Sequence, residues 1–381
     1  MWFFTEEEKD LQRLCRDFAQ KELAPFAHKH DEEESFNLTA FKKMGELGVL
    51  GITADPQYGG TGMGAVAATI VMEEFGSACA GTTLSYLAHT ILCVNNIQNN
   101  CSDEQKAKYL PKLISGAHVG CMGMSEPEYG SDAVGIQTKA VQNADGSFLL
   151  NGTKMWITNA QYADVAYVYT RTGSERKNLS TFIIEKGTPG FSVGKPIHKM
   201  GMRSSPTGEL VFQNAKVDSS QLVGHVGESI YHMMKNLDIE RITIAGISLG
   251  IAQACVDQCV KYAGERKQFG KHIGSFQMIQ KMIAEMATET EMMRSFLYTT
   301  AKNYDLGVRG AANAAQVKLA LPKMATKIAL DAIQLHGGYG YSREFPLERM
   351  MRDNKLNEIG AGTNEVMIMI IAKNLLKDLK D

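Results

Sequence analysis

Glu240 is the residue whose surroundings in the sequence best suit acid–base chemistry. On a helix its neighbours three and four positions away include Leu237 and Ile244, so the carboxylate lies on an apolar stripe. None of these neighbours is basic, whereas Arg241 is spaced to pair with Asp238. Burial without a partner raises the pKa of a carboxyl group, which is how a general base is tuned. The other interpretation is an ion pair with a distant Arg or Lys, and helical spacing alone favours it.

Two further segments have the composition of a site for an anionic or flat ligand. Residues 122–132, MGMSEPEYGSD, are rich in small and hydroxyl side chains, which let backbone N–H groups approach a ligand. Residues 154–159, KMWITN, place Trp156 and Thr158 on one face of a strand, because strand side chains alternate. An ordinary loop is the plainer interpretation of the first segment, and a core tryptophan is a common alternative for the second.

The common nucleotide and metal motifs are missing. Gly60, Gly62 and Ala65 fit the pattern G-x-G-x-x-A, but an Asp-Pro pair stands where the feeding strand should be, which disfavours a Rossmann unit. The patterns GxxxxGK[ST], HExxH and CxxC do not occur. His28 and His30 lie on a charged stretch that is expected to face solvent, so no metal site is predicted.

Composition and charge limit the function classes. The 381 residues are 44% hydrophobic and 22% charged, which is typical of a globular protein with two or three domains. The net charge of −2 offers no strong field for a nucleic acid. The longest apolar runs, such as residues 65–72, are too short for a membrane span. Seven dispersed cysteines indicate a reducing compartment. We expect a cytoplasmic protein, and a mature mitochondrial matrix protein would have the same acidic start.

The first part of the chain is predicted to be a helical domain over residues 1–118. Thr5 precedes three glutamates, which is typical of a helix start because a hydroxyl caps the first turn and acids suit its positive end. Further helices are expected at residues 65–75, 83–96 and 103–113.

A β domain is predicted over residues 119–226, as a small barrel or sandwich. Asn151 and Gly152 lie between two short apolar runs, which is a strong hairpin signal. Strands are expected at residues 148–150, 155–157, 165–170, 181–185 and 210–212.

A C-terminal helical domain is predicted over residues 227–381. Helical spacing of apolar residues covers 228–268, 277–305, 311–335 and 363–379, which should pack as an antiparallel bundle. The expected fold class is α+β, with an N-terminal helical domain, a central β domain and a C-terminal bundle.

Six motifs, in order over nearly the whole chain, resemble the acyl-CoA dehydrogenase family. Each motif is weak alone, and together they are specific. The motifs are residues 124–132 (MSEPEYGSD), 155–159 (MWITN), 265–277 (ERKQFGKHIGSFQ), 334–340 (QLHGGYG), 351–353 (MRD) and 360–365 (GAGTNE). The resemblance implies a bound FAD, an acyl-CoA thioester substrate, electron-transferring flavoprotein as the acceptor, and a homotetramer.

The resemblance also implies roles for individual residues. The positions that match FAD contacts are Met122, Met124, Ser125, Gly130, Ser131, Trp156, Ile157, Thr158, Arg266, Phe269, Gln277, Gln334, Gly337, Gly338, Thr363 and Glu365. Of these, Arg266, Phe269, Gln277 and residues 334–338 resemble the segments that reach the FAD of a neighbouring subunit. The positions that match substrate contacts are Ser131, Asp238, Arg241, Ile244, Gly360, Ala361 and Gly362.

One departure from the family pattern bears on the base. Most members have the base in a C-terminal Tyr-Glu-Gly-Thr motif, but this chain has GAGT at residues 360–363, with no acid. A subset that includes the isovaleryl-CoA dehydrogenases has the base in a Leu-Asp-x-Glu-Arg context instead, which residues 237–241 match. The resemblance therefore selects Glu240 as well. Gly360 in place of a bulky Tyr should open the pocket to a short branched or cyclic acyl chain.

The expected reaction is α,β-dehydrogenation of an acyl-CoA to the enoyl-CoA. Glu240 would remove the α-proton, while the backbone N–H of Ala361 and a ribityl hydroxyl of FAD stabilise the thioester oxygen. Alternatives on the same scaffold are an enoyl-CoA reductase within an electron-transfer complex and a flavin oxidase. A colourless acyl-CoA-binding protein is the alternative from another class.

Overall fold

The structure is a computed structural model that describes residues 3–308 and 310–378. Its N-terminal region is helical. The predicted cap at Thr5 is confirmed, and with Glu8 it forms a capping box: the Thr5 hydroxyl accepts from the Glu8 N–H at 3.1 Å, and the Glu8 carboxylate accepts from the Thr5 N–H at 2.8 Å. The helices are α1 (Glu6–Phe18), α2 (Ala27–Glu32), α3 (Leu38–Glu46), α4 (Ala65–Ala78), α5 (Ala80–Leu87), α6 (Asn95–Asn100) and α7 (Asp103–Ile114).

The helix expected over residues 83–96 is not a continuous α-helix. A π-helical segment, Ala88–Val94, separates α5 from α6. Within it, the buried His89 bonds the Gly120 N–H at 2.9 Å and the Leu113 carbonyl at 3.1 Å. Residues 83–96 are therefore helical throughout, as predicted, but apolar spacing does not distinguish the wider π-helical turn from an α-helical one.

The central region is one sheet with the strand order β6-β7-β3-β2-β4-β5-β8, and β1 pairs with β4 in parallel. It confirms the expected central β region, and it packs its own apolar core. The strands are β1 (Gly120–Gly123), β2 (Lys139–Gln142), β3 (Phe148–Thr158), β4 (Val165–Arg171), β5 (Leu179–Glu185), β6 (Phe191–Val193), β7 (Thr207–Val217) and β8 (Leu222–Val223).

The predicted turn at Asn151 and Gly152 is wrong, because β3 runs through both residues. Gly152 instead lies at a register shift against β7, with φ of +143°. A Cβ there would come within 2.6 Å of the Thr138 hydroxyl, so the glycine permits a close approach within the sheet. The actual turn between β2 and β3 closes where the Asn143 N–H donates to the Ser147 carbonyl at 2.8 Å.

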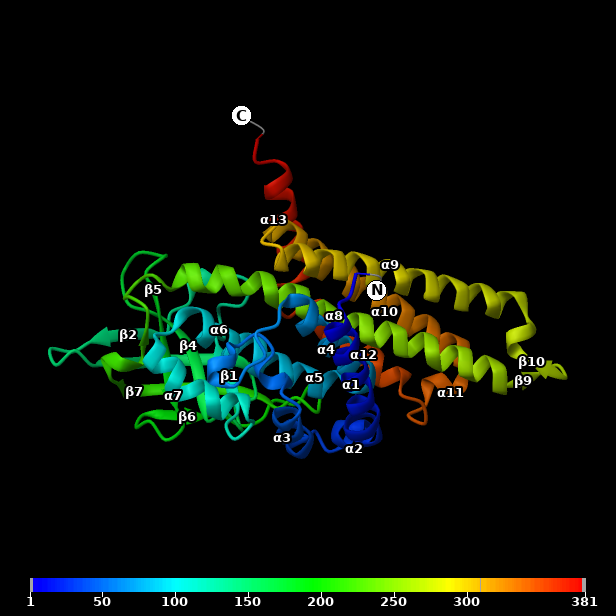
Figure 1. Ribbon diagram of the computed structural model, residues 1–381, viewed down its shortest axis with the longest axis horizontal. Coiled ribbons are helices and arrows are strands. Elements are labelled where there is room, and N and C mark those ends of the chain that lie inside the picture. The colour runs from blue at the N-terminus through cyan, green and yellow to red at the C-terminus, as the bar shows by residue number, and fades with distance from the viewer. Residues whose placement is uncertain (1–2, 309, 379–381) are drawn as a thin grey trace.

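The C-terminal region is the predicted helical bundle. Helix α8 runs from the sheet to the far end of the molecule, where the small β9–β10 hairpin lies (Figure 1). It packs against α4, α9, α10 and α12. The elements are α8 (Ser229–Glu265), β9 (Lys267–Gln268), β10 (Lys271–His272), α9 (Gln277–Asp305), α10 (Ala311–His336), α11 (Gly338–Tyr341), α12 (Leu347–Asn357) and α13 (Asn364–Leu375).

Helix α8 is the one helix, among the residues that the structure describes, that is long and apolar enough to cross a bilayer. Its most apolar 18-residue stretch is 94% buried within the protein. A core helix has the same composition, and α8 is the element around which the N-terminal helices and the bundle share one apolar core.

Candidate active site

Glu240 lies in the buried middle of α8 and is 6% exposed. Its carboxylate makes no hydrogen bond or ion pair with any described residue. Burial raises the pKa of Glu240 to about 7, although the positive charges of Arg241 and Lys318 oppose the shift. The alternative of an ion pair with a distant basic residue is therefore wrong for the part of the chain described, because Lys318 acts on Glu240 through its field and not through a contact.

Two side chains from other elements face the region of Glu240, and neither is predicted from the sequence. Lys318 of α10 is fully buried, and burial lowers its pKa to about 8, while the charge of Glu240 acts in the opposite direction. Tyr169 of β4 is also fully buried; burial and the charge of Glu240 raise its pKa. The site thus lies where α8, α10 and the sheet meet.

Arg241 follows Glu240 and is tied to Asp238 by an ion pair of 3.3 Å, as its spacing predicts. Its Nε is buried and has no hydrogen-bond partner among the described residues. A buried guanidinium N–H without a protein acceptor is available to an anionic or carbonyl-bearing ligand. Ile244, one turn further along α8, is 2% exposed and belongs to the apolar wall.

The segment from Gly360 to Thr363 is a tight turn between α12 and α13. Ala361 and Gly362 have φ of +56° and +93°, the left-handed region that a residue with a Cβ rarely adopts. The backbone N–H of Ala361 has no hydrogen-bond acceptor among the described residues. Lys318 fixes this turn, because its ammonium group donates to the Gly362 carbonyl. Thr363 caps α13 by accepting from the Val366 N–H at 3.3 Å.

The two segments expected to bind a flat ligand lie side by side at the edge of the sheet. The Met155 N–H donates to the Ser125 carbonyl at 2.9 Å, which joins the loop after β1 to the end of β3. Trp156 has φ of +64° and its side chain is exposed, so its indole face is free to stack on a ring. Ile157 is 3% exposed and points into the core of the sheet, so only its backbone is available to a ligand.

A buried ion pair, which the sequence does not predict, holds this loop. The Lys154 ammonium donates to the Glu126 carboxylate at 2.8 Å and to the Met124 carbonyl at 3.0 Å. Glu126 also accepts from the N–H groups of Gln137 and Thr138, at 2.6 and 2.8 Å. Burial raises the pKa of Glu126, but Lys154 and these hydrogen bonds outweigh it and lower the pKa. Burial lowers the pKa of Lys154 to about 8.

A second group of predicted residues gathers at the other end of α8. Arg266, Phe269, Gly337 and Gly338 line an open cavity of about 710 Å³, with the Arg266 guanidinium 5.4 Å from the centre of the Tyr339 ring. The other two members of the group are at the ends of adjoining helices, Gln277 at the start of α9 and Gln334 near the end of α10. Along α8, this group is roughly 39 Å from Glu240, at 1.5 Å a residue.

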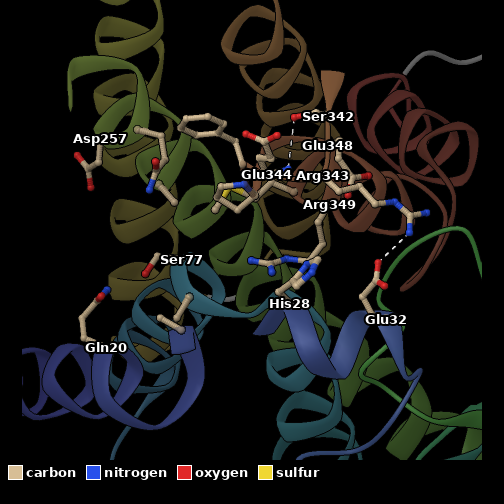
Figure 2. Close-up of a pocket in the computed structure, with 17 residues that line it drawn as sticks. Gln20, His28, Glu32, Ser77, Asp257, Ser342, Arg343, Glu344, Glu348 and Arg349 are labelled. Carbon is tan, nitrogen blue, oxygen red and sulfur yellow. Dashed lines mark hydrogen bonds and ion pairs between the residues drawn. The ribbon is translucent and has the colours of Figure 1, made fainter. Parts of the chain in front are cut away.

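Another cavity, of about 1080 Å³, lies between the N-terminal helices, α8 and the segment that leads into α12 (Figure 2). It shares Ser342 and Glu344 with the cavity beside Arg266. Polar and charged side chains line it, among them His28, Asp257 and Arg349. Glu240 is not among the lining residues, so we do not assign the acyl group to this cavity. A smaller cavity of about 190 Å³ is lined by Asn236 and Ile239, which lie four residues and one residue before Glu240 on α8.

Within residues 3–308 and 310–378, no three His, Cys, Asp or Glu side chains gather in a way that could hold a metal ion. All seven cysteines are buried and unpaired.

Family comparison matches the three regions of the fold in order. The families described as acyl-CoA dehydrogenase N-terminal, middle and C-terminal domains match residues 5–117, 121–215 and 228–376. Mitochondrial isovaleryl-CoA dehydrogenase of Solanum tuberosum is 44% identical over 98% of this chain and 92% of its own length. Mitochondrial 2-methylacyl-CoA dehydrogenase of the same plant is 40% identical, covering 98% of this chain and 91% of its own.

Solved structures show the same fold. Butyryl-CoA dehydrogenase from Megasphaera elsdenii superposes with a TM-score of 0.95 at 36% identity, over 98% of this chain and 99% of that one. A chain from work on the electron transferring flavoprotein of Acidaminococcus fermentans has a TM-score of 0.96 at 38% identity, over 99% and 100%. An FAD complex of PigA has a TM-score of 0.93 at 30% identity, over 98% of each chain. With all three family regions matched and full-length relatives at this identity, the chain belongs to the acyl-CoA dehydrogenase family, whose cofactor is FAD.

Proposed function

We propose that this flavoprotein dehydrogenates a short branched or cyclic acyl-CoA to its enoyl-CoA, with Glu240 as the base. One observation carries the choice of base: Glu240 is a buried carboxylate without a hydrogen-bond or ion-pair partner among the described residues, and burial raises its pKa to about 7. The C-terminal turn, Gly360 to Thr363, offers no acid to compete with it. A base with a pKa near the working pH suits removal of a carbon-bound α-proton.

Different groups of the protein remove the α-proton, stabilise the thioester oxygen and bind the substrate. The Glu240 carboxylate accepts the α-proton. The Ala361 N–H, which has no acceptor among the described residues, donates to the thioester oxygen as charge develops there. We assign Ser131, Asp238 and Arg241 to the CoA side of the substrate, with Ile244, Gly360 and Gly362 beside the acyl group.

The residues near the sheet fit the isoalloxazine ring of FAD. Trp156 exposes an indole face, and the loop at residues 122–131 lies against β3 with its backbone held by Lys154. When bound there, FAD supplies the acceptor for the two electrons that leave the β-carbon. The residues that we propose to hold it are Met122, Met124, Ser125, Gly130, Ser131, Trp156, Ile157 (through its backbone) and Thr158, with Thr363 and Glu365 at its adenosine end.

The remaining FAD-binding residues support a homotetramer. We propose that six residues bind the FAD of another subunit, because they lie at the end of α8 that is roughly 39 Å from Glu240. They are Arg266, Phe269, Gln277, Gln334, Gly337 and Gly338. Phe269 is 92% exposed, as a residue awaiting a partner would be. We also propose that residues 1–118, 119–226 and 227–381 form the three domains, and that the protein is cytoplasmic.

Electron-transferring flavoprotein is the acceptor we propose. A structure with the same fold comes from work on such a flavoprotein in Acidaminococcus fermentans. Reduced protein should transfer electrons to purified electron-transferring flavoprotein much faster than to oxygen. A faster reaction with oxygen would instead identify an oxidase.

The size of residue 360 should set the preference among acyl chains. A Cβ at Gly360 meets only ordinary contacts, the nearest being the Leu356 carbonyl at 3.6 Å, so the backbone there accepts a residue with a side chain. Gly360→Tyr is expected to lower kcat/KM for isovaleryl-CoA by about 10–200-fold relative to butyryl-CoA, the range that steric pocket changes give. Gly360→Ala is the control and should keep the wild-type preference. An unchanged ratio in the Tyr variant would place the acyl chain elsewhere.

Activity should depend on the ionisation of Glu240. Because its pKa is raised to about 7, only about a tenth of the free enzyme carries the charged base one pH unit lower. The value of kcat/KM, which reports free-enzyme groups, should therefore fall about tenfold per pH unit below 7 and level off above it. A profile that stays flat down to pH 5 would contradict a base with this pKa.

An anaerobic titration tests the proposed function. Purified protein should be yellow, and its flavin band near ~450 nm should bleach on adding isovaleryl-CoA or another short branched or cyclic acyl-CoA. A yellow protein that no saturated acyl-CoA bleaches would contradict dehydrogenation and point to the reductase or oxidase. Bleaching only by long straight chains would keep the reaction class and contradict the substrate.

A further inference from the structure

Lys318 lies at the contact between the two parts of the site that act on the thioester. It is fully buried on α10, between the apolar residues Val317 and Leu321 of the core. Its one hydrogen bond among the described residues goes to the Gly362 carbonyl, and it has no ion pair there. A buried ammonium group without an ion-pair partner is costly, so it is rarely kept without a role.

The hydrogen bond fixes the turn that carries the Ala361 N–H. Ala361 and Gly362 both have left-handed backbones, which persist only where neighbouring contacts hold them. A Cβ on Gly362 would come within 2.8 Å of the Met367 side chain, so the turn is also close-packed on its other side. Releasing the Gly362 carbonyl would allow the turn, and with it the direction of the Ala361 N–H, to change.

The same ammonium group acts on Glu240. Its positive charge favours the carboxylate form of Glu240, and the charge of Glu240 in turn favours protonated Lys318. The other charged or titratable groups that act on Glu240 are Arg241 and, from β4, Tyr169. Those that act on Lys318 are Arg241, Glu358 and Glu365, and Glu358 is already bonded to Thr326 and Lys355.

We propose that Lys318 is a positioning residue for the proposed reaction: its ammonium group holds the oxyanion-binding turn in place and keeps the base in its charged form. This inference rests on the proposed function, because it gives Glu240 and the Ala361 N–H their roles there. It adds a residue that touches neither the thioester nor FAD.

Two variants separate the two effects of Lys318. Lys318→Met removes the hydrogen bond and the charge, and an apolar isostere at a buried charge usually preserves folding. Lys318→Gln removes the charge and keeps an N–H donor for Gly362, on a side chain one bond shorter. Lys323→Met, at an exposed lysine of the same helix, is the control.

We expect Lys318→Met to lose about 10–100-fold in kcat at pH 7, because a small displacement of an oxyanion donor is enough for such a loss. The acid limb of its pH profile should move to higher pH, since the carboxylate loses a neighbouring positive charge. Lys318→Gln should show the same shift of the limb but keep more of the wild-type kcat at pH 9. Lys323→Met should match wild type in both.

A readout independent of turnover completes the test. The thioester C=O stretch of a bound enoyl-CoA, measured by difference infrared spectroscopy, drops in frequency when the oxygen accepts hydrogen bonds. Lys318→Met should lose part of that drop, whereas Lys318→Gln and Glu240→Gln should retain it. The inference would be overturned if both FAD-loaded variants, Lys318→Met and Lys318→Gln, had the kcat, the acid limb and the C=O frequency of the wild type. A fully active Glu240→Gln would instead overturn the proposed base, leaving the C=O result to report on Lys318 alone.

Discussion

Glu240→Gln is expected to lower turnover by about 10²–10⁴-fold while the protein keeps its fold and its FAD. The amide has the shape of the carboxylate but cannot accept the α-proton. The substitution also removes a buried charge that has no ion-pair partner among the described residues, so stability should rise or stay the same. Turnover with isovaleryl-CoA, flavin content and the thermal midpoint check the three parts of this expectation.

The matched control for that variant is Glu285→Gln, at a solvent-exposed position of the neighbouring helix α9. It makes the same chemical change outside the site and should leave turnover within twofold or so of wild type. Near-normal turnover in Glu240→Gln would remove Glu240 from the role of base.

Glu126→Gln is expected to weaken the flavin end of the site. It leaves Lys154, which is fully buried, without its counter-charge, and breaking a buried pair in this way costs about 3–5 kcal/mol. Lys154 also holds the Met124 carbonyl, so the loop at residues 122–131 should loosen. We expect a lower thermal midpoint and a weaker hold on FAD, measured by the flavin released on dilution.

The double variant Glu126→Gln with Lys154→Met shows whether the loss of stability comes from the broken ion pair or from separate effects of the two substitutions. Removing both charges takes away the unpaired ammonium, so the double variant should be more stable than Glu126→Gln alone. If instead the two destabilisations simply added, the interaction between these side chains would not be what stabilises the loop.

The sequence predicts the elements whose signal is local. Thr5 caps α1 as predicted, because a helix cap depends on only a few successive residues. The long bundle helices α8, α9 and α10 also match their expected ranges, since their apolar spacing extends over many turns. Local signals do not predict the structure correctly where tertiary packing determines the backbone conformation. Asn151 and Gly152 have the composition of a turn, yet pairing with β2 and β7 extends β3 through them.

In the site, too, the sequence predicts the features that depend on neighbouring residues and not those that depend on tertiary packing. The spacing around Glu240 indicates a carboxylate without a helical partner, which the structure confirms for the described residues. Lys318 is 78 positions further along the chain, and only the packing of α10 on α8 brings it near. A lysine between apolar residues of a helix stripe was the one available signal. Tyr169 gave none, because every residue from Val165 to Thr170 is buried and alternation cannot show which face meets α8.

Proton abstraction itself can be measured apart from electron transfer. The probe is 3,3-dimethylbutyryl-CoA, which has α-protons like isovaleryl-CoA but no hydrogen on its β-carbon, so it cannot be dehydrogenated. In D₂O, FAD-loaded wild-type protein should exchange α-hydrogen of the bound thioester for deuterium, detected by mass spectrometry of the recovered acyl-CoA. Glu285→Gln should exchange at the wild-type rate, whereas Glu240→Gln should show no exchange above that of the thioester incubated without protein. Equal exchange rates in wild type and Glu240→Gln would contradict the assignment of Glu240 as the base.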